Sequence, residues 1–163
     1  MEYEHIVHPF QPIYHEHSKI LILGSLPSVK SREQNFYYGH RQNRFWKVIS
    51  ELFSESLPIT IDEKRDMLLR HDIAIWDVIY SCDIKGSSDS SIRNVTPTDI
   101  ASLIRKTQIS HIYCNGKMAG KLYAEFQEKN IGIPAVVLPS TSPANAAYSV
   151  ECLIQEWRRA VVG

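Results

Sequence analysis

The chain has 163 residues, of which 18 are Lys or Arg and 18 are Asp or Glu. Its length predicts a single domain spanning residues 1–163, and a hydrophobic fraction of 44% with 22% charged residues excludes a disordered or collagen-like protein. Because the charges balance, no global basic field holds this chain on nucleic acid, and any DNA contact must be local.

The first eighteen residues are the one stretch that we expect to be irregular. This N-terminal segment contains His5, His8, His15 and His17. It has no cysteine and no helical register that would close a metal site, so solvated histidines are favoured over metal ligands.

Four short apolar runs predict the strands of a sheet. They are Lys19–Leu23, Ile73–Val78, His111–Cys114 and Ala135–Leu138. Their apolar character is continuous rather than alternating, which is typical of parallel strands covered on both faces.

Segments with helical period separate these runs. The apolar residues of 45–53 recur at i, i+4, i+7 and i+8, and those of 150–157 recur at i, i+3, i+4 and i+7. Strands that alternate with helices of ten or more residues form a parallel sheet between two helical layers, so we expect a three-layer α/β/α fold. The ligand crevice of such folds lies beyond the carboxyl ends of the strands.

Helix boundaries have their own signals. Capping-box spacing occurs at Thr60 with Glu63 and at Thr96 with Asp99, and the second pair encloses Pro97 at a suitable first helical position. A further helix is expected to begin near Gly116 and to end at Asn130 or Gly132.

The cysteines and the apolar runs also limit the cellular setting. Cys82, Cys114 and Cys152 are odd in number and lack Cys-x-x-Cys spacing, which predicts reduced structural thiols and no zinc or cysteine-ligated iron–sulfur site. The longest apolar runs are too short to span a bilayer, and the polar N-terminus lacks a signal-peptide core, which predicts a cytoplasmic protein.

The first predicted strand ends in the turn Gly24-Ser25-Leu26-Pro27-Ser28. Glycine permits close backbone approach here, and proline fixes the exit of the chain. The turn matches neither a dinucleotide-binding motif nor a phosphate-binding P-loop nor a nucleophile elbow. A plain strand-to-helix turn therefore stays open as an interpretation.

The segment from Phe36 to Trp46 is dense in aromatic, amide and basic side chains. Its last two residues start an amphipathic helix and are expected in the core. Four earlier side chains could project into the crevice: Tyr37, Tyr38, His40 and Asn43. A flipped base needs a stacking face, hydrogen bonds to its edge and neutralised phosphates, although a well-packed aromatic loop would also account for these residues.

After the last predicted strand, Pro139–Asn145 offers hydroxyl and backbone N–H groups just before a helix. Such residues are common helix caps. The same geometry binds phosphate, because helix N-termini present free N–H groups.

Together these motifs resemble the uracil-DNA glycosylase superfamily, most closely its hypoxanthine-DNA (deoxyinosine) glycosylase branch. The resemblance rests on Gly24–Ser28, on Tyr38–His40 with Asn43–Trp46, on Ser140–Asn145 and, more loosely, on Trp76–Asp89. It covers the chain from Ile20 to the last helix. It implies a central four-stranded parallel sheet, hydrolysis of an N-glycosidic bond, and a deaminated base flipped from DNA into a pocket at the sheet's carboxyl end.

The resemblance also suggests which base is removed. In the mismatch-specific uracil branch, an Asn in the first turn positions the attacking water, whereas Leu26 stands there in this chain and cannot hydrogen-bond water. A purine-directed branch is therefore favoured, and Asn43 matches the position that supplies the catalytic amide there. Other members carry a histidine and a leucine wedge in the second motif, and the corresponding segment, Ser140–Ala144, has neither.

These considerations give a set of expected site residues. Asn43 is the expected catalytic residue, orienting water or polarising the base. The expected base pocket consists of Gly24, Ser25, Leu26, Tyr38, His40, Asn115 and Ser140, with Tyr38 stacked on the base. The expected phosphate contacts are Ser28, Lys30, Ser31, Arg44, Ser142 and Asn145. We expect no metal or other cofactor, no protein partner, and a monomer acting on DNA.

Other functions stay open at this point. The chain could excise uracil, or it could be a noncatalytic nucleic-acid or nucleotide-binding module of the same fold. A small-molecule hydrolase could use Ser25, Ser28 or Ser140 with His40, although no feature fixes a nucleophile and base. For a glycosylase, monofunctional chemistry is expected, because no lysine stands in the proposed pocket to form a Schiff base.

Overall fold

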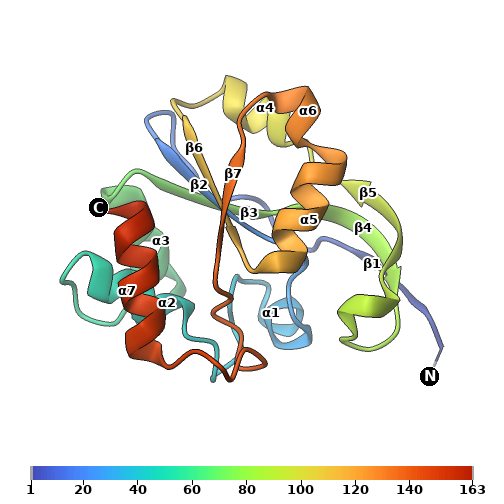
Figure 1. Cartoon of the computed structure of the whole chain (residues 1–163), viewed down its shortest axis with the longest axis horizontal. Coiled ribbons are helices and arrows are strands. Elements are labelled where there is room, and N and C mark those ends of the chain that lie inside the picture. Colours follow the sequence, from blue (N-terminus) through green and yellow to red (C-terminus); the bar gives the residue numbers. More distant parts are fainter. Residues whose placement is uncertain (1, 163) are drawn as a thin grey trace.

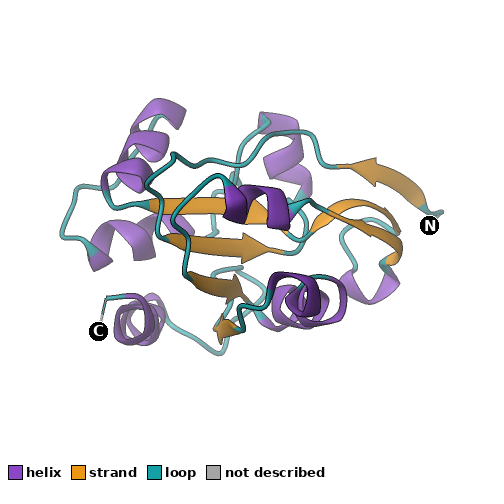
Figure 2. Cartoon of the chain, turned by 90° about the horizontal axis from the view of Figure 1, so that it is seen from above, coloured by secondary structure: helices purple, strands orange, loops and turns teal. Residues whose placement is uncertain are grey.

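The structure, a computed structural model, describes residues 2–162 (Figure 1). Its central sheet has four parallel strands, β2 (Ile20–Gly24), β3 (Ile73–Asp77), β6 (His111–Asn115) and β7 (Ala135–Leu138), in the order β3-β2-β6-β7. All four strands were predicted from apolar runs. The strands lie between helical layers, which confirms the three-layer α/β/α fold (Figure 2).

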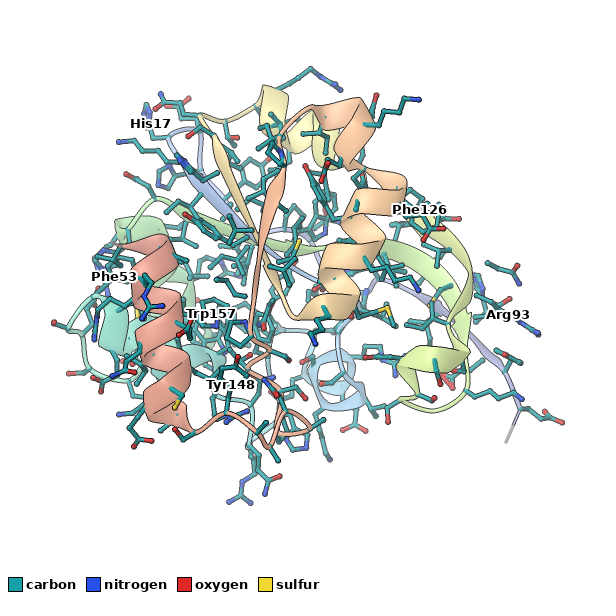
Figure 3. All side chains as sticks on the ribbon, viewed as in Figure 1. His17, Phe53, Arg93, Phe126, Tyr148 and Trp157 are labelled. Atoms are coloured by element: carbon teal, nitrogen blue, oxygen red, sulfur yellow. The ribbon has the colours of Figure 1, made fainter. Side chains whose placement is uncertain are left out.

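One helical layer consists of α2 (Phe45–Leu52), α3 (Ile61–Arg70) and α7 (Val150–Val161). Their apolar residues form a core with the side chains that β2 and β3 place on this face, such as Ile22 and Ile75. Trp157 of α7 is fully buried in this core, and its ring nitrogen donates to the carbonyl of Pro139 at 2.9 Å (Figure 3). This bond ties the last helix to the end of β7.

The opposite face of the sheet is covered by α4 (Ile100–Arg105), α5 (Lys117–Phe126) and α6 (Glu128–Ile131) (Figure 1). The short helix α1 (Val29–Gln34) follows β2. Strand β7 lies at the sheet edge, and its Val136 and Val137 are about half exposed (50% and 49%). The expectation that every strand is covered on both faces is therefore wrong for β7.

Some helix-start predictions are confirmed and one is wrong. Thr60 and Glu63 form the predicted capping box of α3. The single helix expected from near Gly116 is two helices, α5 and α6, which meet at Gln127, and the left-handed Gly132 ends α6 as expected. Pro97 does not begin a helix. It is the last residue of a strand, and Asp99 caps α4 by accepting from the backbone N–H of Ser102 at 3.1 Å.

A second, antiparallel sheet was not predicted. It consists of β1 (Glu4–Val7), β4 (Ile79–Ile84) and β5 (Arg93–Pro97), in the order β1-β4-β5, with a 3₁₀ turn at Asp89–Ser91 before β5. The expectation of an irregular segment over the first eighteen residues is therefore wrong for Glu4–Val7, whereas residues 8–18 contain no helix or strand beyond a single bridge at Ile13. Ile6 packs with Leu21 of β2 and Ile79 of β4 in a second hydrophobic core, and this contact anchors the otherwise polar strand β1.

Candidate active site

A cavity of about 430 Å³ opens at the carboxyl ends of the parallel strands. It is lined by the turn after β2, the loop before α2, the end of β3, the start of α5 and the loop after β7. Asn43 and all seven expected base-pocket residues contribute to its wall, as do Ser28, Ser31 and Ser142. The structure therefore brings together residues as far apart in the sequence as Gly24 and Ala144.

Asn43 is held at the cavity by its side-chain oxygen. This oxygen accepts from the backbone N–H of Phe45 at 2.9 Å and from the hydroxyl of Thr141 at 2.8 Å. Because both partners donate, the carboxamide oxygen is oriented toward them. Among residues 2–162, no partner is found for the amide nitrogen of Asn43, which leaves its two N–H groups to a ligand.

Thr141 joins two amides across the cavity wall. Its fully buried hydroxyl donates to Asn43 and accepts from the side-chain nitrogen of Asn115 at 3.0 Å. Its backbone N–H donates to the side-chain oxygen of Asn115, also at 3.0 Å. The network fixes both amides in one geometry. Thr141 lies within the second motif, but sequence reasoning gave it no role.

Tyr38 has an unusual conformation beside Asn43. Its backbone lies in the left-handed region with φ of 53°, which is costly for a bulky residue and is found mainly where surrounding structure enforces it. Its ring stacks on Phe45 with centroids 4.0 Å apart, so that face is not free for the expected stacking on a base. Burial, with a smaller contribution from the charge of Asp77, raises the pKa of Tyr38, which keeps the phenol protonated.

The turn after β2 depends on glycine. A Cβ at Gly24 would lie 2.4 Å from Oδ1 of Asp77 and 3.2 Å from the hydroxyl of Tyr38. The turn is anchored to β3 and β4 by bonds from the N–H groups of Val78 and Ile79. Two polar side chains can therefore approach the backbone at the base of the cavity only because no side chain occupies this position.

Two of the expected phosphate contacts hold loops in this structure. Ser31 is 1% exposed, and its hydroxyl accepts from the N–H of Gly39 at 2.9 Å. The guanidinium of Arg44 donates to four carbonyls of the loop after β7, those of Thr141, Ser142, Asn145 and Tyr148. Ser31 is not presented to solvent as a phosphate contact would be, and Arg44 is partly buried with most of its N–H groups bound within the protein. Both act as positioning residues in this structure, and their contact with phosphate stays a prediction.

The other expected phosphate contacts differ in how open they are. Ser28 is exposed, and its hydroxyl caps α1 by accepting from the N–H of Ser31 at 3.1 Å. Lys30 is exposed beside Glu33, with its nitrogen 3.4 Å from the carboxylate. Ser142 accepts from the N–H of Ala144, and Asn145 donates to the carbonyl of Ser140. Lys30, Arg44 and Asn145 do not line the cavity itself.

Three features of the cavity were missed from the sequence. Lys117, the exposed first residue of α5, lines the wall, so the statement that no lysine stands in the pocket is wrong. The loop between β4 and β5 contributes Gly86, Ser87 and Asp89. Only the loose similarity of the segment that follows Trp76 hinted at this contribution.

The third missed feature is a buried pair of titratable residues. Asp77, at the end of β3, lines the cavity and is bonded through Oδ2 to Nε2 of His8 at 2.7 Å. The expectation of solvated histidines is therefore wrong for His8, whose side chain is 2% exposed. It holds for His5 and His17, whose side chains are each 63% exposed.

Cys82 and Cys114 are buried, Cys152 is exposed, and burial raises the pKa of Cys114 to about 12. Within residues 2–162, no three His, Cys, Asp or Glu side chains are grouped as metal ligands. No helix in this described part of the chain is long and apolar enough to cross a membrane.

The chain is similar to known proteins over most of its length. A family model described as the uracil DNA glycosylase superfamily matches residues 11–160. The chain is similar to a hypoxanthine DNA glycosylase of Methanosarcina acetivorans, with 35% identity over 142 residues that cover 86% of this chain and 89% of the relative. A hypoxanthine DNA glycosylase of Methanosarcina barkeri is 31% identical over 138 residues, covering 83% and 86%.

The fold has a solved counterpart. A solution NMR structure of a protein from Methanosarcina acetivorans, described as a uracil DNA glycosylase, superposes with a TM-score of 0.80. The two chains are 32% identical, and the match covers 93% of each.

Proposed function

This chain belongs to the uracil DNA glycosylase superfamily, and we propose that it removes hypoxanthine from DNA by hydrolysing the N-glycosidic bond of deoxyinosine. Two relatives described as hypoxanthine DNA glycosylases share 35% and 31% identity with it over more than four fifths of its length. The observation that carries the proposal is the cavity at the carboxyl end of the sheet, where a rigidly held amide, Asn43, faces a turn without a polar catalytic side chain.

The geometry fits a reaction that depends on placed hydrogen-bond donors. Breaking the bond to a purine leaves an oxocarbenium-like sugar and a base that departs with negative charge. Asn43 has free N–H groups and a fixed oxygen, so it is suited to orient water or to stabilise the departing base. Leu26 lines the same cavity and offers no hydrogen bond. The lack of a polar side chain at this position of the turn favours the purine over uracil.

Base release by the purified chain tests the function. Single- and double-stranded oligonucleotides with one deoxyinosine or one deoxyuridine would be incubated with enzyme in excess, and abasic sites would be read as alkali-labile breaks. Release from deoxyinosine is the expected result. Release from deoxyuridine alone would show that the chain excises uracil instead of hypoxanthine. DNA binding with no release from either substrate would favour a noncatalytic module.

Monofunctional chemistry is part of the proposal. Lysines that form Schiff bases are desolvated in apolar pockets or lie beside another cation, whereas Lys117 is exposed at the first position of α5. The expected product is therefore an intact strand with an abasic site. Strand cleavage without added alkali, abolished in Lys117→Ala, would contradict this part.

We also propose that the chain acts as a monomer and as one domain over residues 1–163. One chain supplies every residue of the cavity wall. The second hydrophobic core joins Ile6 of β1 and Ile79 of β4 to Leu21 of β2, so both sheets share it. A molar mass of about one chain by light scattering, with and without substrate DNA, is the expected result.

A further inference from the structure

His8 and Asp77 form a buried pair at the base of the cavity, and nothing in the proposed mechanism uses it. Their side chains are 2% and 4% exposed. Nε2 of His8 lies 2.7 Å from Oδ2 of Asp77, and Nδ1 lies 2.8 Å from the carbonyl oxygen of Phe10. The phenylalanine ring also packs edge-on against the imidazole. Both ring nitrogens of His8 therefore face oxygen atoms.

The hydrogen bonds determine where the proton of this pair lies. A carbonyl oxygen only accepts, so Nδ1 must carry a hydrogen toward Phe10. A second proton then lies between Nε2 and Oδ2, either on the ring or on the carboxyl group. In both cases Oδ1, the other oxygen of Asp77, carries no proton. The bond to His8 thus leaves Oδ1 of Asp77 as an oxygen that can only accept a hydrogen bond.

The free oxygen lies beside a free donor. Oδ1 of Asp77 and the hydroxyl of Tyr38 approach the same point, at 2.4 Å and 3.2 Å from where a Cβ on Gly24 would be. Within residues 2–162, the Tyr38 hydroxyl is the single buried side-chain polar atom without a hydrogen bond of good geometry. The side chain of Asn115 is near enough to lower its pKa, but by less than burial raises it. Buried polar groups are normally paired, so this unpaired hydroxyl points to a ligand.

We propose that His8 is a positioning residue for base selection, fixing an acceptor at Asp77 next to a donor at Tyr38 so that the cavity reads the N1–H and O6 edge of hypoxanthine. This proposal rests on the proposed function and names how the substrate is chosen. Hypoxanthine offers a donor at N1 and an acceptor at O6. Adenine, from which it arises by deamination, offers an acceptor at N1 and a donor at N6. With Asp77 opposite N1, its acceptor-only oxygen matches the N1–H of hypoxanthine and opposes the N1 lone pair of adenine, whereas the hydroxyl of Tyr38 can pair with O6 or N6.

The chain path around His8 explains how a residue that does not line the cavity contacts Asp77. The backbone N–H of His8 donates to the carbonyl of Tyr80 in β4 at 2.7 Å, directly after the four paired residues of β1. The N-terminal strand thus delivers the imidazole behind Asp77. The phenols facing the pair are Tyr37, with its ring 6.1 Å from that of His8, and Tyr38. The charge of Asp77 adds to burial in raising the pKa of each phenol.

The test compares two bases that differ at this edge. Deoxyinosine and deoxynebularine, a purine with a lone pair at N1 and no O6, would be placed in the same duplex, and single-turnover release rates would be measured. Intrinsic differences between the leaving groups cancel when the ratio of the two rates is compared between variants. His8→Leu frees the proton of Asp77 to move to Oδ1, and the ratio should fall at least tenfold.

Three further variants make the test specific. In Asp77→Asn, the amide donates to Nε2 of His8 and turns its oxygen to the cavity, so the ratio should stay within about threefold of the wild type. Asp77→Leu removes the acceptor and should lower the ratio as His8→Leu does. His5→Leu is the matched control, because His5 of β1 also bonds an aspartate, with its Nδ1 2.8 Å from Oδ1 of Asp83, but does so at the surface, and its ratio should not change.

The outcomes separate this inference from the proposed function. A wild type that releases hypoxanthine while a cooperatively folded His8→Leu or Asp77→Leu variant keeps its ratio would overturn the inference alone. A tenfold fall of the ratio in the near-isosteric Asp77→Asn would also overturn it, because the pocket would then read charge rather than a fixed acceptor. A wild type that releases no hypoxanthine would refute both proposals.

Discussion

Replacement of Thr141 by valine tests whether the hydrogen-bond network around Asn43 supports catalysis. Valine keeps the shape of threonine but removes the hydroxyl that donates to Asn43 and accepts from Asn115. Asn43 Oδ1 keeps the N–H of Phe45 as a partner, whereas the side-chain nitrogen of Asn115 loses the hydroxyl to which it donates at 3.0 Å. The cost is therefore dominated by one unsatisfied polar atom, about 1–3 kcal/mol.

This cost predicts a lower melting temperature, by roughly 2–4 °C for each kcal/mol in a chain of this size. The larger effect is expected on the reaction. If Asn43 loses its orientation by as much as about 1 Å, single-turnover release of hypoxanthine should fall about 10²-fold. Thr141→Ser is the matched control, because serine keeps the hydroxyl and should retain a rate close to that of the wild type.

Two results would refute this reasoning. A Thr141→Val protein with wild-type rate and melting temperature would show that the network is dispensable. Equal loss in the valine and serine variants would mean that the methyl group, through packing, matters instead of the hydroxyl.

Further predictions concern the loops, the DNA contacts and the thiols. Arg44→Met removes donors to four carbonyls, so amide hydrogen exchange of residues 141–148 should accelerate and hypoxanthine release should slow; unchanged exchange would contradict the positioning role. If Lys30 contacts a phosphate, Lys30→Ala should reduce the slope of log affinity against log salt by about 0.9, and an identical slope would remove it from the interface. Because Cys82 and Cys114 are buried, a thiol reagent should label only Cys152 in the native protein and all three cysteines in denaturant; fast labelling of a second thiol would contradict the fold here.

The central sheet was predictable from the sequence because its strands are covered by helices. Apolar character is then continuous along each strand, as in Leu21, Ile22 and Leu23, all fully buried. The antiparallel sheet was not predictable in this way. Three of the four residues in β1 and three of the five in β5 are exposed, so neither strand has an apolar run. Pro97 was mistaken for a helix start, because proline also suits an edge strand such as β5.

The site was predictable where topology alone determines it. The carboxyl ends of parallel strands meet at one edge, so the turn at Gly24, the residue Asn115 and the loop at Ser140 were expected together, and they are. Specific partners were not predictable. His8 lies 69 residues from Asp77, and Arg44 lies 98 residues from the Ser142 carbonyl that it binds. No local pattern marks such pairs, because only the assembled sheet brings them into contact.

The most direct test of the account is the single-turnover rate of hypoxanthine release by Asn43→Ala beside the wild type. Asn130→Ala is the control, because it makes the same change from asparagine to alanine at an exposed residue of α6. The account predicts a loss of about 10²-fold or more for Asn43→Ala, as for removal of a preorganised donor, and no loss for the control. An Asn43→Ala protein that releases hypoxanthine at the wild-type rate would contradict the central claim.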